Sequence, residues 1–178
     1  MKTLRNAVPM VALAALAAAG CFLVSGQFVV NYTLPSPSTF QSAGTFAGVG
    51  VDLNNISEYA DHKGDLKRVE DLALIGDFHN NSGTAVNVDV YIVPAGTISL
   101  TPGQVLSTGV KLWGSLAVPG NATVSVDWNK SATLFTGRQT LIDEIKGDGR
   151  FALYAVASGA FDVTLTKGAV IAVIAAGK

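Results

Sequence analysis

The feature that most constrains this fold is an alternation of apolar and polar residues over short segments. Residues 84–93 give the clearest case, because one face carries only branched apolar side chains: Val86, Val88, Val90 and Ile92. Residues 27–34 and 122–128 alternate in the same way. A period of two is typical of strands buried on one face. Clusters of Pro, Gly, Asn and Ser separate such segments roughly every ten residues, as turns do between strands.

This spacing predicts an all-β fold, an antiparallel β-sandwich of about eight to ten strands with two short helices. A small β-barrel is the alternative. We expect the helices at residues 55–64 and 139–146, where apolar spacing changes and a glycine follows as a stop signal. No long helix alternates with the strands, which argues against a parallel α/β sheet.

Short polar connectors predict which strands pair. Residues 71–79 and 84–93 flank the turn cluster Asn80-Asn81-Ser82-Gly83, the strongest hairpin signal in the chain. Ser158-Gly159 and Lys167-Gly168 separate three final strands, expected at 150–157, 161–166 and 169–175. We expect both of these connectors to be hairpin turns as well.

The first twenty residues have the pattern of an export signal. Lys2 and Arg5 precede an apolar run from Ala7 to Ala19, and Gly20-Cys21 follows. Ala18-Ala19-Gly20-Cys21 resembles the bacterial lipobox, which predicts a lipoprotein signal peptide at 1–20, lipidation of Cys21 and one domain at 21–178. Simple cleavage after Ala19 and an uncleaved membrane anchor over residues 7–30 are the alternatives.

Composition excludes several classes of function. The net charge is −1, which gives no basic surface for nucleic acid. Cys21 is the only cysteine, so the chain has neither an internal disulfide nor a cysteine metal site. Only His62 and His79 are histidines, and no serine has a nucleophile-elbow motif around it. We therefore expect no enzymatic activity, no catalytic residues, no metal and no cofactor.

One acidic segment offers oxygen ligands for calcium. Four such side chains lie within ten residues: Asp52, Asn54, Glu58 and Asp61. Calcium takes six to eight oxygens, but the spacing is not that of an EF-hand. The competing interpretation is a capped, solvated helical turn. Asp143, Glu144 and Asp148 form a second acidic patch, interpreted as the exposed face of the short helix.

Five Asn-x-Ser/Thr sequences also occur, at Asn31, Asn55, Asn80, Asn121 and Asn129. In a secreted eukaryotic or archaeal protein they would indicate glycosylation. With a bacterial leader the better interpretation is that these residues form exposed turns.

The segment Gly20-Cys-Phe-Leu-Val-Ser-Gly-Gln-Phe-Val-Val30, with residues 51–63 and 66–71 after it, resembles a family of uncharacterised bacterial lipoproteins. The resemblance covers about the first half of the chain. It implies export and a β-sandwich, with a short acidic helical turn before the central strand. The family carries no known activity, so the resemblance implies no catalytic or binding residue.

Taken together, these patterns predict a lipid-anchored structural or binding module of the cell envelope, on the periplasmic or outer surface of a membrane. Its partners would be the membrane itself and an envelope protein or polysaccharide. The rival functions are a carrier of a small apolar ligand and a secreted hydrolase. Few residues separate Cys21 from the strand at 27–34, so the anchored domain would lie close to the bilayer.

Overall fold

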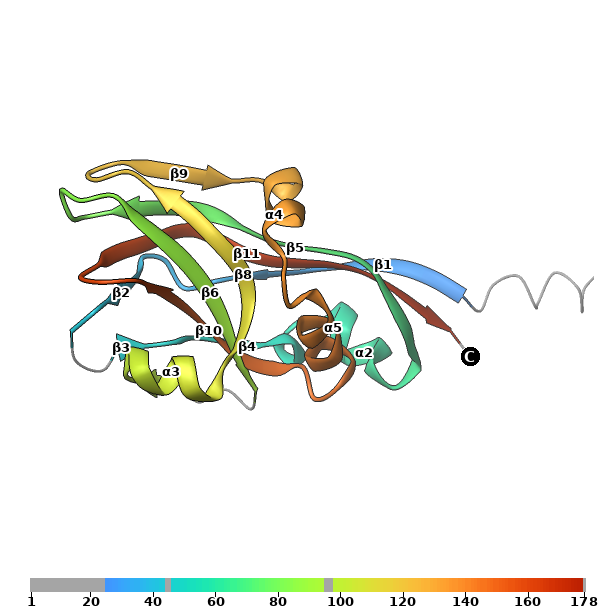
Figure 1. Cartoon of the computed structure of the whole chain (residues 1–178). Helices are drawn as coiled ribbons and strands as arrows, with labels where there is room; N and C mark the ends of the chain where they lie inside the picture. The colour runs from blue at the N-terminus through green and yellow to red at the C-terminus, as the bar shows by residue number, and fades with distance from the viewer. Residues whose placement is uncertain (1–24, 44–45, 95–97, 178) are drawn as a thin grey trace, which may run out of the picture.

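The computed structural model describes residues 25–43, 46–94 and 98–177. Cys21 and the predicted signal peptide lie outside these residues. The described chain forms two packed antiparallel sheets, which confirms the predicted β-sandwich (Figure 1). The alternation of residues 27–34 holds: Val30 and Leu34 are buried, whereas Val29 and Asn31 are exposed.

The larger sheet has five strands in the order β1-β11-β5-β9, with β2 also paired to β11. Its strands are β1 (Ser25–Thr33), β2 (Ser38–Gln41), β5 (Leu66–Asn80), β9 (Thr123–Val126) and β11 (Asp162–Gly177). The longest strand, β11, pairs with β1 along nine residues and with β5 on its other side. The first and last strands of the described chain are therefore neighbours.

The smaller sheet has four strands in the order β4-β10-β6-β8. These are β4 (Val49–Asp52), β6 (Val86–Pro94), β8 (Val110–Val118) and β10 (Arg150–Ala157). A separate two-stranded ribbon pairs β3 (Phe46–Ala47) with β7 (Ser99–Leu100). Every pairing in the described chain is antiparallel, as the sequence predicts.

Four α-helices and two 3-10 turns complete the described chain. The helices are α2 (Ser57–His62), α3 (Pro102–Thr108), α4 (Trp128–Leu134) and α5 (Arg138–Lys146), and the turns are η2 (Leu53–Asn55) and η3 (Lys63–Asp65). The two predicted helices correspond to α2 and α5. The structure adds α3, which a capping box between Thr101 and Gln104 begins, and α4, which the Asp127 side chain caps.

The predicted hairpin pairings are wrong, although the turns themselves exist. β5 lies in the larger sheet and β6 in the smaller one, so residues 81–85 cross between sheets. β10 and β11 are likewise in different sheets. A turn cluster shows that the chain reverses, but it does not show whether the two strands share a sheet.

Residues 161–166 and 169–175 are not separate strands either. Both belong to β11, and the expected turn at Lys167-Gly168 is a bulge at which the register with β5 shifts. Lys167 has a φ of 51°. An extra residue in the left-handed region is how a bulge bends one strand without ending it. The bulge leaves β11 long enough to pair with β2 and β1 in succession.

The core fills the space between the sheets with aliphatic and aromatic side chains. Trp113 of β8 is fully buried, with ring centroids 5.8 Å from Phe78 and 6.2 Å from Phe135. A cavity bounded by residues of both sheets, among them Phe40 and Leu153, has a volume of about 10 Å³. A cavity of that size has room for about one water molecule. This part of the interior is packed side chains.

Candidate functional site

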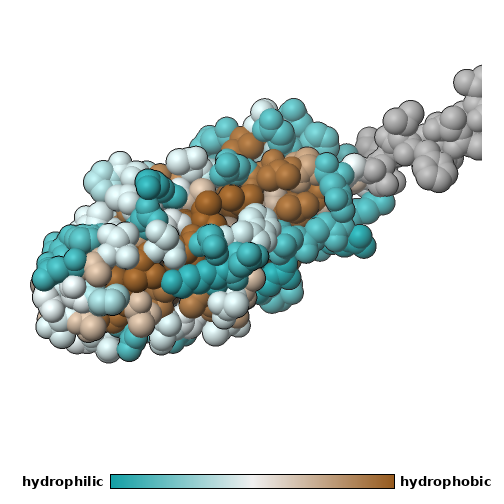
Figure 2. Space-filling model, turned by 90° about the horizontal axis from the view of Figure 1, so that it is seen from above, coloured by the Kyte–Doolittle hydropathy of each residue, from teal (hydrophilic) through white to brown (hydrophobic). Residues whose placement is uncertain are grey.

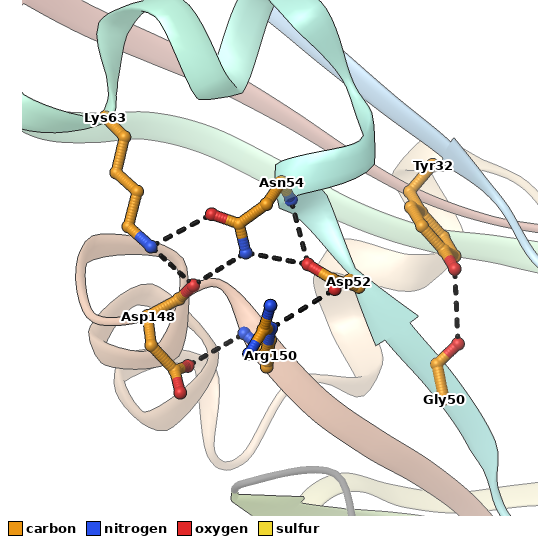
Figure 3. Close-up of polar contacts among 7 residues, drawn as sticks. All are labelled: Tyr32, Gly50, Asp52, Asn54, Lys63, Asp148 and Arg150. Carbon is orange, nitrogen blue, oxygen red and sulfur yellow. Dashed lines mark hydrogen bonds and ion pairs between the residues drawn. The ribbon is translucent and has the colours of Figure 1, made fainter.

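The acidic segment after β4 lies in a network of polar side chains rather than around an open centre (Figure 3). The Asp52 carboxylate accepts hydrogen bonds from the backbone N–H of Asn54 at 3.1 Å and from its Nδ2 at 2.7 Å. The first of these caps the 3-10 turn η2. The other Asp52 oxygen accepts from Arg150 Nε at 3.1 Å. Both oxygens of Asp52 are therefore engaged by donors within the chain.

Asn54 joins this carboxylate to the turn between α5 and β10. Its Nδ2 also donates to the Asp148 carbonyl at 3.0 Å, and its Oδ1 accepts from Lys63 Nζ at 2.9 Å. Lys63 Nζ donates to that same carbonyl at 2.7 Å, and the Asp148 carboxylate accepts from the backbone N–H of Arg150 at 2.9 Å. Figure 3 shows these five residues converging from the end of β4, η2, η3, the α5–β10 turn and the start of β10.

Asp52, Asn54, Lys63, Asp148 and Arg150 together form a polar cluster that we call the clasp. Its electrostatics favour the ionised form of Asp52. Hydrogen bonds from Asn54 hold the pKa of the Asp52 carboxyl below its ordinary value, and the positive charge of Arg150 acts in the same direction. Two protein cations are thus the partners of these oxygens, Lys63 of the Asn54 amide oxygen and Arg150 of the Asp52 carboxylate.

The four calcium candidates do not converge on one point. Glu58 and Asp61 lie on the exposed side of α2, and the Glu58 carboxylate accepts from the hydroxyl of Ser57 at 3.0 Å. Asp52 and Asn54 face Arg150 and Lys63 instead. No group of three or more His, Cys, Asp or Glu side chains in the described ranges is placed to hold a metal ion. The arrangement matches the capped turn that the sequence offered as the competing interpretation.

The second acidic patch is also part of local structure. Asp143 accepts from Gln139 at 2.8 Å along α5, and Asp148 belongs to the clasp. Burial raises the pKa of Glu144, and the charges of Asp148 and Asp143 raise it further.

A buried tyrosine fixes α2 to α5 beneath the clasp. The Tyr59 hydroxyl donates to the carbonyl of Ile145 at 2.7 Å, and the side chain is fully buried. Burial, with the nearby charges of Asp148 and Asp52, raises the pKa of Tyr59 to about 12. Gly149 packs against its ring with a φ of 76°, and a β-carbon there would lie 2.5 Å from the hydroxyl oxygen. The segment from Asp52 to Asp65 is thereby attached to the α5–β10 turn.

The two histidines are placed apart and have separate partners. His62 stacks on Phe28 of β1 with centroids 5.0 Å apart, and its Nδ1 lies 3.0 Å from the Glu58 carbonyl. His79 Nδ1 lies 2.9 Å from the hydroxyl of Thr123 on β9. Neither imidazole contacts a carboxylate and a hydroxyl together in the described structure, as a catalytic triad requires.

The Asn-x-Ser/Thr sites divide into two kinds. Four of the asparagines are exposed: Asn31, Asn55, Asn121 and Asn129. Asn80 is fully buried, Asn31 lies within β1 and Asn129 within α4, so the interpretation of all five as exposed turn residues is wrong for these three. The Asn80 amide group bonds to backbone on both sides of the crossing between the sheets, because a buried amide needs partners for donor and acceptor alike.

An open groove of about 500 Å³ lies at the end of the larger sheet where the described chain begins. It is lined by the start of β1, the start of β5 and the end of β11: Gly26, Gln27, Lys67, Arg68, Glu70, Ala175 and Ala176. Arg68 Nε and Gln27 Nε2 both donate to the Glu70 carboxylate, at 2.5 and 3.5 Å. Most of the side chains that line the groove are polar or charged, and Figure 1 shows that the first described residues of β1 lie beside the end of β11.

The described residues include no helix that is both long and apolar enough to cross a bilayer. A scan against protein-family models found no matching family, and searches of curated proteins and of solved structures likewise found no match. Lipidation of Cys21 and the resemblance to bacterial lipoproteins therefore stay predictions.

Sequence reasoning missed the cations of the clasp and the exposed edge of β1. Lys63 and Arg150 are 87 positions apart, and only the α5–β10 turn brings them together. The sequence gives no signal for the edge, since residues 25–33 contain neither a charge nor a proline. Strands at sheet edges usually carry such residues.

Proposed function

We propose that this chain is an exported, lipid-anchored β-sandwich that acts as a structural or binding module of the bacterial cell envelope. The observation that carries the proposal is the start of β1 at Ser25, four positions after Cys21. β1 is then paired to β11 over all of its nine residues. An acylated Cys21 would hold the sandwich against the bilayer with almost no tether, which suits docking at the membrane surface.

The packing of the described chain favours a structural or docking role over the two rivals. A carrier of an apolar ligand needs an interior pocket of some hundreds of Å³. The cavity between the sheets has about 10 Å³. A hydrolase needs a cleft that gathers a base with a nucleophile, whereas the charged side chains of the clasp are paired with one another.

The exposed loops at either end of the sandwich then offer the surface for an envelope protein or a polysaccharide. The clasp supports such a role, because it holds η2, α2 and the α5–β10 turn in one fixed arrangement. Rigid loops bind with a smaller loss of conformational entropy than mobile ones.

Metabolic labelling with a clickable palmitate tests the anchor in cells that express the full chain. We expect label on the wild type and none on Cys21→Ser. The double variant Cys21→Ser with Ser25→Cys is the matched control, since it restores a thiol four positions away and should also stay unlabelled. Equal absence of label from wild type and Cys21→Ser would refute lipidation.

Gel mobility distinguishes the remaining alternatives. Cleavage before Cys21 removes twenty residues from a chain of 18.3 kDa. A labelled and shortened product supports the lipoprotein. An unlabelled, shortened and released product indicates simple secretion, whereas an unlabelled product of full length in the membrane indicates an uncleaved anchor.

A further inference from the structure

One edge of β1 has no strand partner along any of its nine residues in the described structure. β1 stands at the end of the larger sheet and pairs only with β11. Its nine residues, Ser25 to Thr33, include no charge, no proline and no register shift. Natural sheets protect long edges with such devices, because an open edge can pair with another strand.

The backbone groups that face this edge can be identified from one hydrogen bond. Leu34 N–H donates to the Gly168 carbonyl at 2.8 Å, in the same register as the β1–β11 pairing. In an antiparallel ladder both backbone groups of a residue point to the same neighbour, and the direction alternates along the strand. Even-numbered residues of β1 therefore bond to β11. Gln27, Val29 and Asn31 direct their N–H and C=O groups away from the sheet.

The other edges in the described chain are short or covered. β9 and β4 have four residues each. Beyond β9, the hydroxyl of Ser131 on α4 accepts from the N–H of Leu74, which covers the edge of β5. β8 is bonded near its start, where the Leu112 carbonyl accepts from the N–H groups of Thr136 and Gly137. The unpaired edge of β1 is thus a feature of this strand and not of the fold as a whole.

We propose that β1 pairs with β1 of a second copy of this chain, antiparallel and about a two-fold axis through Val29. Full overlap of the two nine-residue strands sets the register. Val29 then faces Val29 of the other copy, Gln27 faces Asn31, and Ser25 faces Thr33. The outward N–H and C=O groups of these residues are those a ladder in this register uses.

The side chains of β1 are complementary to themselves in this register. On the outer face, valine meets valine and one amide side chain meets another, so no apolar residue is placed opposite a charge. Val29 has 57% of its surface exposed, the largest fraction among the large apolar side chains of the described residues. Burying such a side chain against its own copy is a favourable cross-strand contact.

The outer face of the larger sheet extends this match beyond one strand. The pairings place three half-buried apolar residues on the same face as Val29: Ile75, Ile171 and Val173. From above, apolar residues form a band that runs toward the amino-terminal end of the molecule (Figure 2). A two-fold axis perpendicular to the sheet keeps both outer faces on the same side. The two bands then meet at Val29 in one continuous surface.

The same axis fits the placement of the amino termini. It relates the two Ser25 residues at opposite ends of the shared strand pair and at equal height. Both preceding segments can therefore enter one bilayer when the axis lies along the membrane normal. Confinement to a membrane raises the effective concentration of the copies. Pairing itself uses only β1, so it does not rest on the anchor.

Disulfide trapping in membranes tests the register on the full chain. Val29→Cys is expected to give a disulfide-linked dimer on mild oxidation, since directly paired residues have Cα atoms about 5.5 Å apart, within disulfide range. Asn31→Cys is the matched control, because it is exposed on the same face but faces Gln27. It should give no dimer alone and a dimer when co-expressed with Gln27→Cys. Oxidation of the wild type shows how much disulfide-linked dimer forms through Cys21 alone.

Charge substitution tests the pairing without cysteines. Two differently tagged full-length copies should co-purify from detergent extracts, and Val29→Lys in both should abolish this because like charges face each other. Val29→Lys with Val29→Glu should restore it. Val173→Lys adds the same charge to the outer face away from the edge and should leave co-purification intact. Circular dichroism checks that each variant keeps its strand content.

Three results would overturn the proposal. Equal cross-linking of Val29→Cys and Asn31→Cys would mean random collision. Failure of the wild-type copies to co-purify, with no Val29→Cys dimer, would mean no pairing. Release of both Val29→Lys and Val173→Lys from membranes, with co-purification unchanged, would assign the apolar face to lipid instead of to a second copy.

Discussion

Replacement of Asn80 by alanine should destabilise the sandwich more than any exposed substitution. Asn80 is fully buried where β5 leaves the larger sheet. Its Nδ2 donates to the carbonyls of Thr84 at 2.8 Å and of Val118 and Pro119 at 3.3 Å each. Its Oδ1 accepts from the backbone N–H and the hydroxyl of Ser82, at 3.0 and 2.7 Å. The amide thus connects the last residue of β5 with the crossing segment and with the end of β8.

The magnitude follows from these bonds. Loss of the two shortest backbone contacts, to Thr84 and from Ser82, removes about 1 kcal/mol each. The buried carbonyl of Val118 loses this donor, which adds about 1 kcal/mol or more. Asn80→Ala should therefore lower the free energy of unfolding by about 3 kcal/mol, out of a total of about 5–15 kcal/mol. In a domain of this size the melting temperature should fall by roughly 10 °C.

The assay is urea unfolding of a fragment comprising residues 22–178, with circular dichroism as the readout. Asn87→Ala is the matched control, because Asn87 is exposed on β6, and it should change the free energy by less than about 0.5 kcal/mol. Asn80→Asp tests how the stability changes with pH. Its carboxylate would face three carbonyl oxygens, which raises its pKa in the folded state. Its stability should be nearest to the wild type below about pH 4 and fall as the pH rises. A loss below 1 kcal/mol for Asn80→Ala would refute the role of this amide.

Three further measurements examine the clasp and its surroundings. Gly149→Ala should cost several times more stability than Gly159→Ala in the same urea assay: both have left-handed φ, 76° and 78°, but only the first places a β-carbon against Tyr59. Equal costs would contradict the packing argument. Because the pKa of Tyr59 is raised to about 12, its contribution is complete below pH 10 and is lost from there to about pH 12. Tyr59→Phe should remove that alkaline loss in a pH series of melts. Asp52→Asn should cost about 0.5–1 kcal/mol at pH 7 and less as the pH falls below 4, since a lowered carboxyl pKa stabilises the fold only above that range. If the wild type and Asp52→Asn lost stability equally as the pH fell below 4, that result would contradict the role of the Asp52 carboxylate.

The fold class was predictable because alternation is a local property. Val30 and Leu34 are buried and Val29 is exposed, as a period of two requires. The pairing of strands was not predictable, because it depends on contacts between distant residues. Asn80 and Val118 lie 38 positions apart, and no pattern near the turn reveals that contact.

The two additional helices show a different kind of miss. Thr101-Pro102-Gly103-Gln104 has the residues of a capping box with proline at the first position, which is a helix-start signal. The partner of Asp52 could not be predicted for a non-local reason, since Arg150 reaches Asp52 through the pairing of β10 with β4.

The central position of β11 determines when this fold can form. Among the described strands it is the last to be synthesised, yet it lies between β1 and β5 and joins the first described strand to the rest of the larger sheet. Domains generally begin to fold from the amino terminus during synthesis. Here the larger sheet lacks its central strand until β11 has been made, and pairings between residues far apart in the sequence form slowly. The larger sheet therefore stays incomplete while the preceding strands are made, which suits the proposed export of an unfolded chain.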